Sequence, residues 1–244
     1  MQTMSVDTQK HLRTEHNVSP FSSYLKEIVY GASDGIVTTF AVVAGFAGAN
    51  LAETAPLFVV LLFGLANLAA DGASMGISSF LSLRAEQDYY NHQRRREQRE
   101  IRDNPTYERQ ETEDILIKRG FSKKDAVKIT ELYSNNPEYW ADFMMSYELE
   151  LANPTGENPF YTGIATTLAF MAFGFIPLIP YVFMRGSAHL FAVSCSTTLT
   201  ALLLLGILRW RVTKQSFIRS VGEIVLIGSV SAAIAYIVGV FFRT

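Results

Sequence analysis

The chain is poor in the residues that usually hold zinc or form disulfide bonds. It has one cysteine, Cys195, and four histidines in 244 residues. A single cysteine excludes an intrachain disulfide and any site built from several thiolates. Because Cys195 lies in an apolar segment, we interpret it as a small buried hydrophobic residue. Zinc usually recruits histidine or cysteine, and the charged middle of the chain offers only His92.

Two further absences narrow the class of protein. No basic stripe with interleaved aromatic residues accompanies the net charge of −2, so nucleic-acid binding has no support. The first 20 residues are polar and lack an apolar core followed by a small-residue cleavage site. We therefore expect no removable signal peptide, and we expect the first long apolar segment to act as the insertion signal.

Long apolar segments are abundant. A hydrocarbon core about 30 Å thick is crossed by about 20 apolar residues in a helix. Segments of this length lie near residues 28–50, 56–83, 160–181, 188–208 and 218–242. By contrast, residues 84–150 hold 27 of the 44 charged side chains. The sequence therefore predicts an all-α integral membrane protein with five transmembrane helices and a polar helical insert between the second and third.

Basic residues near the link between the fourth and fifth segments set the predicted orientation. Such residues concentrate in loops on the cytoplasmic side of a membrane. The residues in question are Arg209, Arg211, Lys214 and Arg219. With five spans, this orientation places the N-terminus and the insert inside and the C-terminus outside. The predicted organisation is a polar tail (1–20), two membrane helices (21–83), a cytoplasmic helical domain (84–155) and three membrane helices (156–244).

Polar residues within the apolar segments predict a path for ions. Asp34 lies inside the first segment, where a charge is costly and tends to mark an ion or proton pathway. Its place near the cytoplasmic end leaves helix capping or snorkelling as alternatives. In the second segment, Asn67, Asp71 and Met75 recur every four residues and form one stripe on a helix. We expect this stripe to face a partner helix or a hydrated path, with Met75 as a soft ligand for a transition metal.

Glycine and proline residues predict how some of these helices pack. Gly31 and Gly35 in the first segment have a spacing that permits close helix approach, and Gly72 and Gly76 in the second repeat it. The prolines of the FGFIPLIPY stretch predict a kink or an end in the third span.

The insert contains two pairs of glutamates at helical spacing. Glu97 and Glu100 precede a break at Asn104-Pro105, and Glu108 and Glu111 follow it. Residues three apart share a helix face, so each pair can aim two carboxylates at one point. The break lets the second pair fold back towards the first. The pattern is compatible with an acidic cage for hard cations and also with an ordinary solvated charged face.

A later helix, predicted over residues 137–151, brings further candidate ligands together. Met144, Met145 and Glu148 lie within one helical turn of one another. The methionines would tilt the preference of an acidic site towards Fe²⁺ over Mg²⁺ or Ca²⁺. A helical domain this small is marginal by itself, so we expect it to dock on the membrane helices or on a second copy.

Taken together, these stretches resemble the vacuolar iron transporter family, whose members are five-span carriers that move ferrous iron out of the cytosol. The resemblance covers nearly the whole chain from about Glu27. It rests on the ordered motifs ASDGIVTTFAVVAG, ADGASMGISSFLS, RREQREI followed by ERQE, NPEYWADFMMSYELEL and GFIPLIPY. In plant members a glutamate commonly stands where this chain has Asn67, whereas here Asp71 supplies an acid one turn closer to Met75.

The resemblance implies roles for the residues already singled out. It implies a translocation path lined by Asp34 and Met75, and a homodimer with its pore between subunits and proton antiport as the driving force. It also implies that the cytoplasmic domain binds metal through Glu97, Glu100, Glu108, Glu111, Met144, Met145 and Glu148. We accordingly expect a secondary transporter and no enzyme, with Fe²⁺ or Mn²⁺ as the transported ion and no prosthetic group.

Two other functions stay open at this point. Carboxylate-rich helices also build di-iron oxidase centres, although these typically use Glu-x-x-His motifs, which the sequence lacks. A membrane-anchored metal-binding scaffold without transport is the other alternative, and the polar stripe of the second span speaks against it. The short polar tail favours a prokaryotic plasma membrane, with a vacuolar membrane as the alternative.

Overall fold

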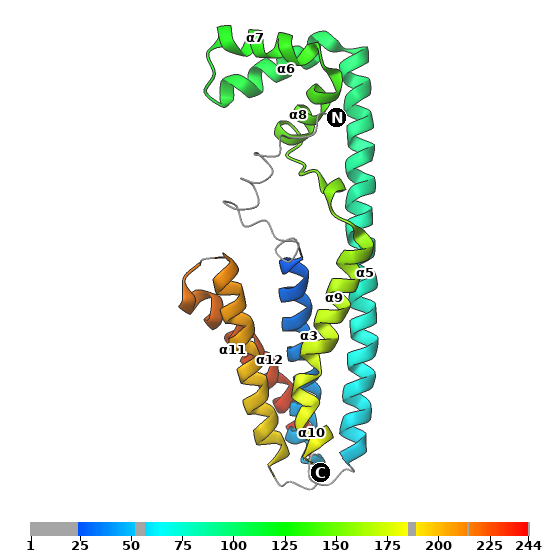
Figure 1. Ribbon diagram of the computed structural model, residues 1–244, viewed down its shortest axis with the longest axis vertical. Helices are drawn as coiled ribbons and strands as arrows, with labels where there is room; N and C mark the ends of the chain where they lie inside the picture. Colours follow the sequence, from blue (N-terminus) through cyan, green and yellow to red (C-terminus); the bar gives the residue numbers. More distant parts are fainter. Residues whose placement is uncertain (1–23, 52–56, 185–188, 214, 244) are drawn as a thin grey trace, which may run out of the picture. The chain divides into compact units, whose positions relative to one another are not determined.

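The computed structural model describes residues 24–51, 57–184, 189–213 and 215–243, and within these ranges it is almost entirely helical and contains no strand. Five helical segments are long and apolar enough to cross a membrane. They are α3 (Leu25–Gly48), α5 (Leu57–Asp103), α9 with α10 (Pro159–Gly174 and Ile179–Phe183), α11 (Leu190–Thr213) and α12 (Phe217–Phe241) (Figure 1). The predicted all-α class with five membrane spans is confirmed.

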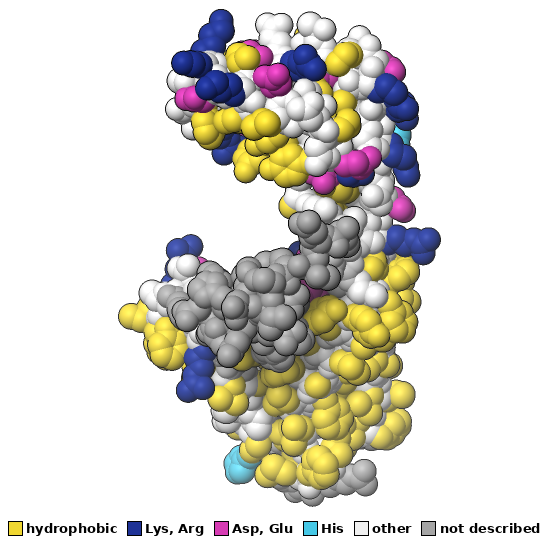
Figure 2. Space-filling view, turned by 45° about the horizontal axis from the view of Figure 1, so that its top comes forward, with side chains coloured by type: hydrophobic (Ala, Val, Ile, Leu, Met, Phe, Trp, Pro, Cys, Tyr) yellow, Lys and Arg dark blue, Asp and Glu magenta, His cyan; other side chains and the backbone are white. Residues whose placement is uncertain are grey.

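The chain divides into two compact units. The membrane unit contains the residues up to Phe80 and those from Phe160 onward, and the insert unit contains Leu81–Pro159. Figure 2 shows hydrophobic side chains spread over the membrane unit and most of the charged side chains on the insert unit. Helix α5 is continuous over 47 residues and contributes to both units.

Small residues hold α9 close to α3 within the membrane unit. A Cβ atom added at Gly31 would lie 2.6 Å from the carbonyl oxygen of Thr166, and one added at Gly35 would collide with the carbonyl of Phe170. The predicted close approach at the first glycine pair is therefore confirmed, with α9 as the partner. Helix α3 also packs against α11 and α12.

The second glycine pair, on α5, allows that helix to pack closely against α9. A Cβ atom at Gly76 would lie 2.8 Å from the carbonyl oxygen of Gly163, and one at Gly72 would lie 3.2 Å from side-chain atoms of Phe170 and Met171. Helix α9 is thus packed against both α3 and α5, the two helices that carry the predicted ion path.

The third span is interrupted near its end. Helix α9 ends at Gly174, and a 3-10 turn, η2 (Ile176–Leu178), leads into α10. The Ser194 hydroxyl on α11 donates a hydrogen bond of 2.7 Å to the Pro177 carbonyl. A buried carbonyl at a helix break needs such a partner, so the interruption predicted from the prolines is both present and stabilised.

Three short helices follow α5 in the insert unit: α6 (Pro105–Lys118), α7 (Lys123–Ser134) and α8 (Pro137–Tyr147). Ser122 caps α7 by accepting from the Asp125 amide, and Asn136 caps α8 by accepting from the Tyr139 amide. Asn104 precedes α6 but makes no capping bond with its side chain. Their core contains Ile101, Leu116, Ala126, Trp140, Ala141, Phe143 and Met144.

The last insert helix is shorter than predicted. Helix α8 ends at Tyr147, and Glu148 follows it as the C-terminal cap instead of lying inside a helix to residue 151. Glu150 has a positive φ of 53°, which a regular helix does not allow. The chain then leaves through a short 3-10 turn, η1 (Pro154–Gly156), whose Pro154 carbonyl and the Glu157 carbonyl both accept from the Gln87 amide on α5.

Candidate metal centre

Three glutamates from separate parts of the insert unit meet at one point. Glu97 lies on α5, Glu108 on the first turns of α6, and Glu148 directly after α8. Their carboxylates each offer an oxygen within 4.8 Å of the others. Glu97 is 2% exposed and Glu108 is 4% exposed. Oxygen ligands at this separation are suited to one divalent cation.

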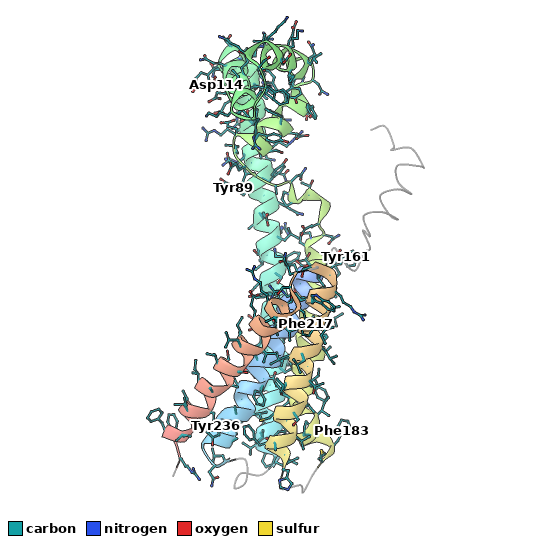
Figure 3. All side chains as sticks on the ribbon, turned by 90° about the vertical axis from the view of Figure 1, so that its left-hand side faces the viewer. Tyr89, Asp114, Tyr161, Phe183, Phe217 and Tyr236 are labelled. Atoms are coloured by element: carbon teal, nitrogen blue, oxygen red, sulfur yellow. The ribbon has the colours of Figure 1, made fainter. Side chains whose placement is uncertain are left out.

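The local sequence explains why the three side chains converge. The break at Asn104 ends α5 only one residue before Pro105 starts α6, so Glu97 and Glu108 lie on helices joined by a very tight turn. Arg94 binds α8 to α5, because its guanidinium contacts Asp142 at 2.7 Å and Glu138 at 2.8 Å. Figure 3 shows the side chains of this unit, with Tyr89 of α5 and Asp114 of α6 labelled.

The electrostatics of the centre oppose the presence of three negative charges. Burial, followed by the charges of Glu108 and Glu148, raises the pKa of Glu97 to about 8. Burial also raises the pKa of Glu108. Glu148 is exposed to solvent, and its partial desolvation together with the charges of Glu111 and Glu108 raises its pKa to about 7. The interaction between the Glu97 and Glu108 carboxyls adds to the rise in the pKa of Glu97.

Two of the other predicted acidic residues stand at the edge of this group. Glu100 is paired with Arg96 at 3.1 Å between Oε1 and Nε. Glu111 accepts a hydrogen bond from the exposed Tyr107 hydroxyl. The charges of both glutamates act on Glu148, so all five acidic residues form one cluster with Glu97, Glu108 and Glu148 at its centre.

Both predicted methionine ligands are fully buried. Met144 and Met145 are each 0% exposed. Met144 packs in the core of the insert unit, and its Sδ lies 3.3 Å from the Thr112 hydroxyl, which donates to it. Sequence reasoning did not select Thr112, although its place four residues after Glu108 puts it on the same helix face.

The predicted path residues lie in the membrane unit. Asp34 on α3 and Asn67, Asp71 and Met75 on α5 are all half-buried. The charge of Asp71 acts on the Asp34 carboxyl, so these two acids are neighbours. Asn67, Asp71 and Met75 therefore lie on one helix, as their spacing predicted.

A cavity of about 720 Å³ lies beside Asp34 in the membrane unit. Its lining comes from α3, α11 and α12 and includes Lys26, Ser33, Asp34 and Arg209, but none of the three stripe residues of α5. The sequence singled out Arg209 only as a basic residue flanking the link between the fourth and fifth apolar segments. Arg209 is in fact ion-paired with Glu223 at 2.8 Å.

The fold and the acidic centre define a class of protein: a five-helix membrane protein with a carboxylate-rich helical insert after its second span. Comparison with known families assigns it further, since residues 25–240 match the VIT family. The chain belongs to this family.

Three named relatives are similar to this chain over most of their lengths. The chain is 33% identical over 232 residues to vacuolar iron transporter 2 of Oryza sativa subsp. japonica, covering 94% of this chain and 93% of that protein. It is 36% identical over 230 residues to the vacuolar iron transporter of Plasmodium berghei, covering 91% and 83%. It is 30% identical over 236 residues to vacuolar iron transporter 1 of Arabidopsis thaliana, covering 96% and 93%.

Proposed function

We propose that this protein is a secondary transporter that moves Fe²⁺, and also Mn²⁺, out of the cytosol. The observation that carries the proposal is the meeting of Glu97, Glu108 and Glu148 within 4.8 Å in a unit continuous with a membrane helix. Membership of the VIT family and the relatives named as vacuolar iron transporters support it.

Capture of the ion begins at the insert unit, which acts as the cytoplasmic metal-binding domain. The carboxylates of Glu97, Glu108 and Glu148 replace water around a divalent ion, and the ion displaces the proton that the raised pKa of Glu97 retains in the cluster. Glu100 and Glu111, at the edge of the cluster, attract the ion and complete its ligands. Met144 and Met145 favour Fe²⁺ over Mg²⁺ because a thioether is a soft ligand.

Translocation then uses the polar residues of the membrane unit. Asp34 and Asp71 are neighbouring carboxylates at membrane depth, where acidic residues commonly belong to ion and proton pathways. Asn67 and Met75 lie on the same stripe of α5 and supply further ligands. Exchange of protons at these acids drives release of the ion on the other side.

The proposal includes an assembly and a location. A second copy of the chain completes the pore, so the working unit is a homodimer in a lipid bilayer. The N-terminus and the insert (residues 84–155) face the cytoplasm and the C-terminus faces outward. The candidate locations are a prokaryotic plasma membrane and a vacuolar membrane, and the names of the relatives favour the second.

Uptake into proteoliposomes tests the proposal. The purified protein should accumulate Fe²⁺ and Mn²⁺, and an imposed pH gradient should accelerate accumulation. Met75→Ala should abolish uptake while Fe²⁺ binding to the insert persists, and Glu100→Ala should weaken binding. Protein that binds the ions but never accumulates them would identify a scaffold, and sustained oxygen consumption with Fe²⁺ would identify an oxidase.

Proton coupling has its own variant. Asp71→Asn removes the charge that lies near Asp34 but keeps the shape of the side chain. We expect its uptake to lose the dependence on the pH gradient. Unchanged, gradient-driven uptake in Asp71→Asn would count against proton exchange at this residue.

A further inference from the structure

A chain of buried hydrogen bonds lies next to the glutamate centre. The indole N–H of Trp140 donates to Thr112 Oγ1 at 2.8 Å. The Thr112 hydroxyl in turn has two acceptors, the Glu108 carbonyl oxygen at 2.8 Å and Met144 Sδ at 3.3 Å. Trp140 is 2% exposed, and Thr112 and Met144 are not exposed at all.

Helical spacing connects this chain of bonds with the carboxylates. Thr112 follows Glu108 by four residues on α6, and Met144 on α8 precedes Glu148, the C-terminal cap of that helix, by four residues. Residues four apart lie one above the other on a helix face. Glu108 therefore meets Glu148 at one level, and Thr112 meets Met144 at the next.

The Thr112 hydroxyl can serve only one of its acceptors at a time. A hydroxyl carries one hydrogen and two lone pairs, and the Trp140 N–H already occupies a lone pair. When the hydrogen points to Met144 Sδ, it restrains a side chain that otherwise has three rotatable bonds. When it points to the Glu108 carbonyl, the sulfur is released and no buried hydroxyl is left unsatisfied.

We propose that Thr112 is a positioning residue that orients the Met144 thioether. Through this thioether it sets the preference of the glutamate cluster for Fe²⁺, which binds sulfur ligands, over Mn²⁺, which prefers oxygen ligands. The proposal rests on the proposed function, in which the insert captures Fe²⁺. Thr112 does not touch the ion and acts through Met144. Carboxylates bind Mn²⁺ well without sulfur, so misplacing the thioether weakens Fe²⁺ binding more than Mn²⁺ binding.

Matched substitutions separate this role from a general effect on folding. Thr112→Val keeps the shape and removes the hydroxyl, and Thr112→Ser restores it. Thr130→Val is the control, because Thr130 is a buried threonine on α7 in the same unit, and its hydroxyl has no partner among the described residues. Trp140→Phe removes the N–H that orients the hydroxyl and leaves Thr112 and Met144 unchanged.

The experiment measures Kd for Fe²⁺ and for Mn²⁺ under anaerobic conditions, on the full-length protein in detergent. We expect the ratio of Kd for Mn²⁺ to Kd for Fe²⁺ to fall about tenfold in Thr112→Val, as is typical when a residue supporting a ligand is lost. Thr112→Ser and Thr130→Val should keep the parental ratio. Trp140→Phe should lower the ratio, and it provides the test if Thr112→Val does not fold.

A double-mutant cycle shows whether Thr112 acts through the sulfur. In a Met144→Leu background, Thr112→Val should leave the ratio unchanged, because the thioether it positions is gone. An unchanged ratio in Thr112→Val, or an equal loss of both ions, overturns the proposal. A parental protein that binds neither ion overturns instead the proposed function of the insert, so the two failures are distinct.

Discussion

Glu97 and Glu108 face each other from two different helices although both are almost completely buried. Their carboxylates belong to a group within 4.8 Å, and Glu97 Oε1 and Glu108 Oε2 have no hydrogen-bond partner in the part of the chain that the structure describes. Two buried carboxylates at this separation are both charged only when a cation lies beside them, and otherwise one of them binds a proton. Protonation and metal binding are therefore alternative ways to stabilise the same site.

The metal-free protein should lose stability in its insert unit as the pH rises. The pKa of Glu97 is raised from 4.5 to about 8, and that of Glu148 from 4.5 to about 7. A carboxyl with a raised pKa in the folded state contributes stability that is fully present below pH 4.5 and is lost as the pH rises through the folded pKa. Thermal unfolding followed by circular dichroism between about pH 5 and pH 9 should show a falling midpoint.

A Glu97→Gln variant checks the cause of this pH dependence. It removes the group with the higher pKa, so the midpoint should vary much less with pH and should lie about 4 °C above that of the parent at pH 8. Stability that rises with pH in the metal-free parent would contradict the raised pKa values.

Metal ions should stabilise the insert unit, and more at high pH than at low pH. Ligand carboxylates must lose their protons before they bind, so the shift in midpoint caused by Mn²⁺ should be larger at pH 8 than at pH 6. Glu108→Gln should weaken binding by on the order of tenfold or more. Glu131→Gln is the control, because Glu131 is an exposed glutamate on α7 outside the cluster, and an equal effect there would argue against a specific site.

Loss of the Arg94 guanidinium should loosen α8. Arg94 contacts Asp142 at 2.7 Å and Glu138 at 2.8 Å, and these partners are partly exposed, so we expect Arg94→Gln to cost about 1 kcal/mol. Arg95→Gln removes the same charge from an exposed position on the same helix and should be nearly neutral. Denaturant unfolding of both variants measures the change in the free energy of unfolding. Equal changes would show that the contacts of Arg94 with Asp142 and Glu138 do not stabilise the protein.

An added methyl group at Gly76 should disturb the packing of α5 on α9. A Cβ atom there would lie 2.8 Å from the Gly163 carbonyl and would collide with the Thr167 side chain, so Gly76→Ala should cost about 2 kcal/mol. Gly222→Ala on α12 is the matched control, because nothing lies within 4 Å of its added Cβ. Gly222→Ala should be neutral or stabilising by about 0.5 kcal/mol. Unfolding midpoints in detergent distinguish the two.

The sequence predicted the spans more fully than it predicted the centre. Hydropathy depends on local composition, so the five spans could be recognised without tertiary information. The meeting of Glu97, Glu108 and Glu148 depends on the turn at Asn104 and on the docking of α8, which spacing alone does not determine. The same limit applies to Glu100, whose pairing with Arg96 is a choice of side-chain conformation.

Thr112 illustrates a second limit. A threonine inside a helix usually bonds to the carbonyl four residues earlier, and Thr112 does so with Glu108. Its contacts with Trp140 and Met144 come from a helix about 30 residues away in the chain. Its place four residues after Glu108 indicates its helix face but not these contacts, and Thr130, which is equally buried, has no such contacts among the described residues.

The hydrogen bond from Trp140 to Thr112 also gives the insert unit an optical reporter. The chain has two tryptophans, and the other, Trp210, lies on α11 in the membrane unit. Trp210→Phe would leave a single indole, bonded to the residue that contacts Met144. Paramagnetic Fe²⁺ or Mn²⁺ arriving at the neighbouring glutamates should quench its emission, so that loading of the intact protein can be timed without an attached label.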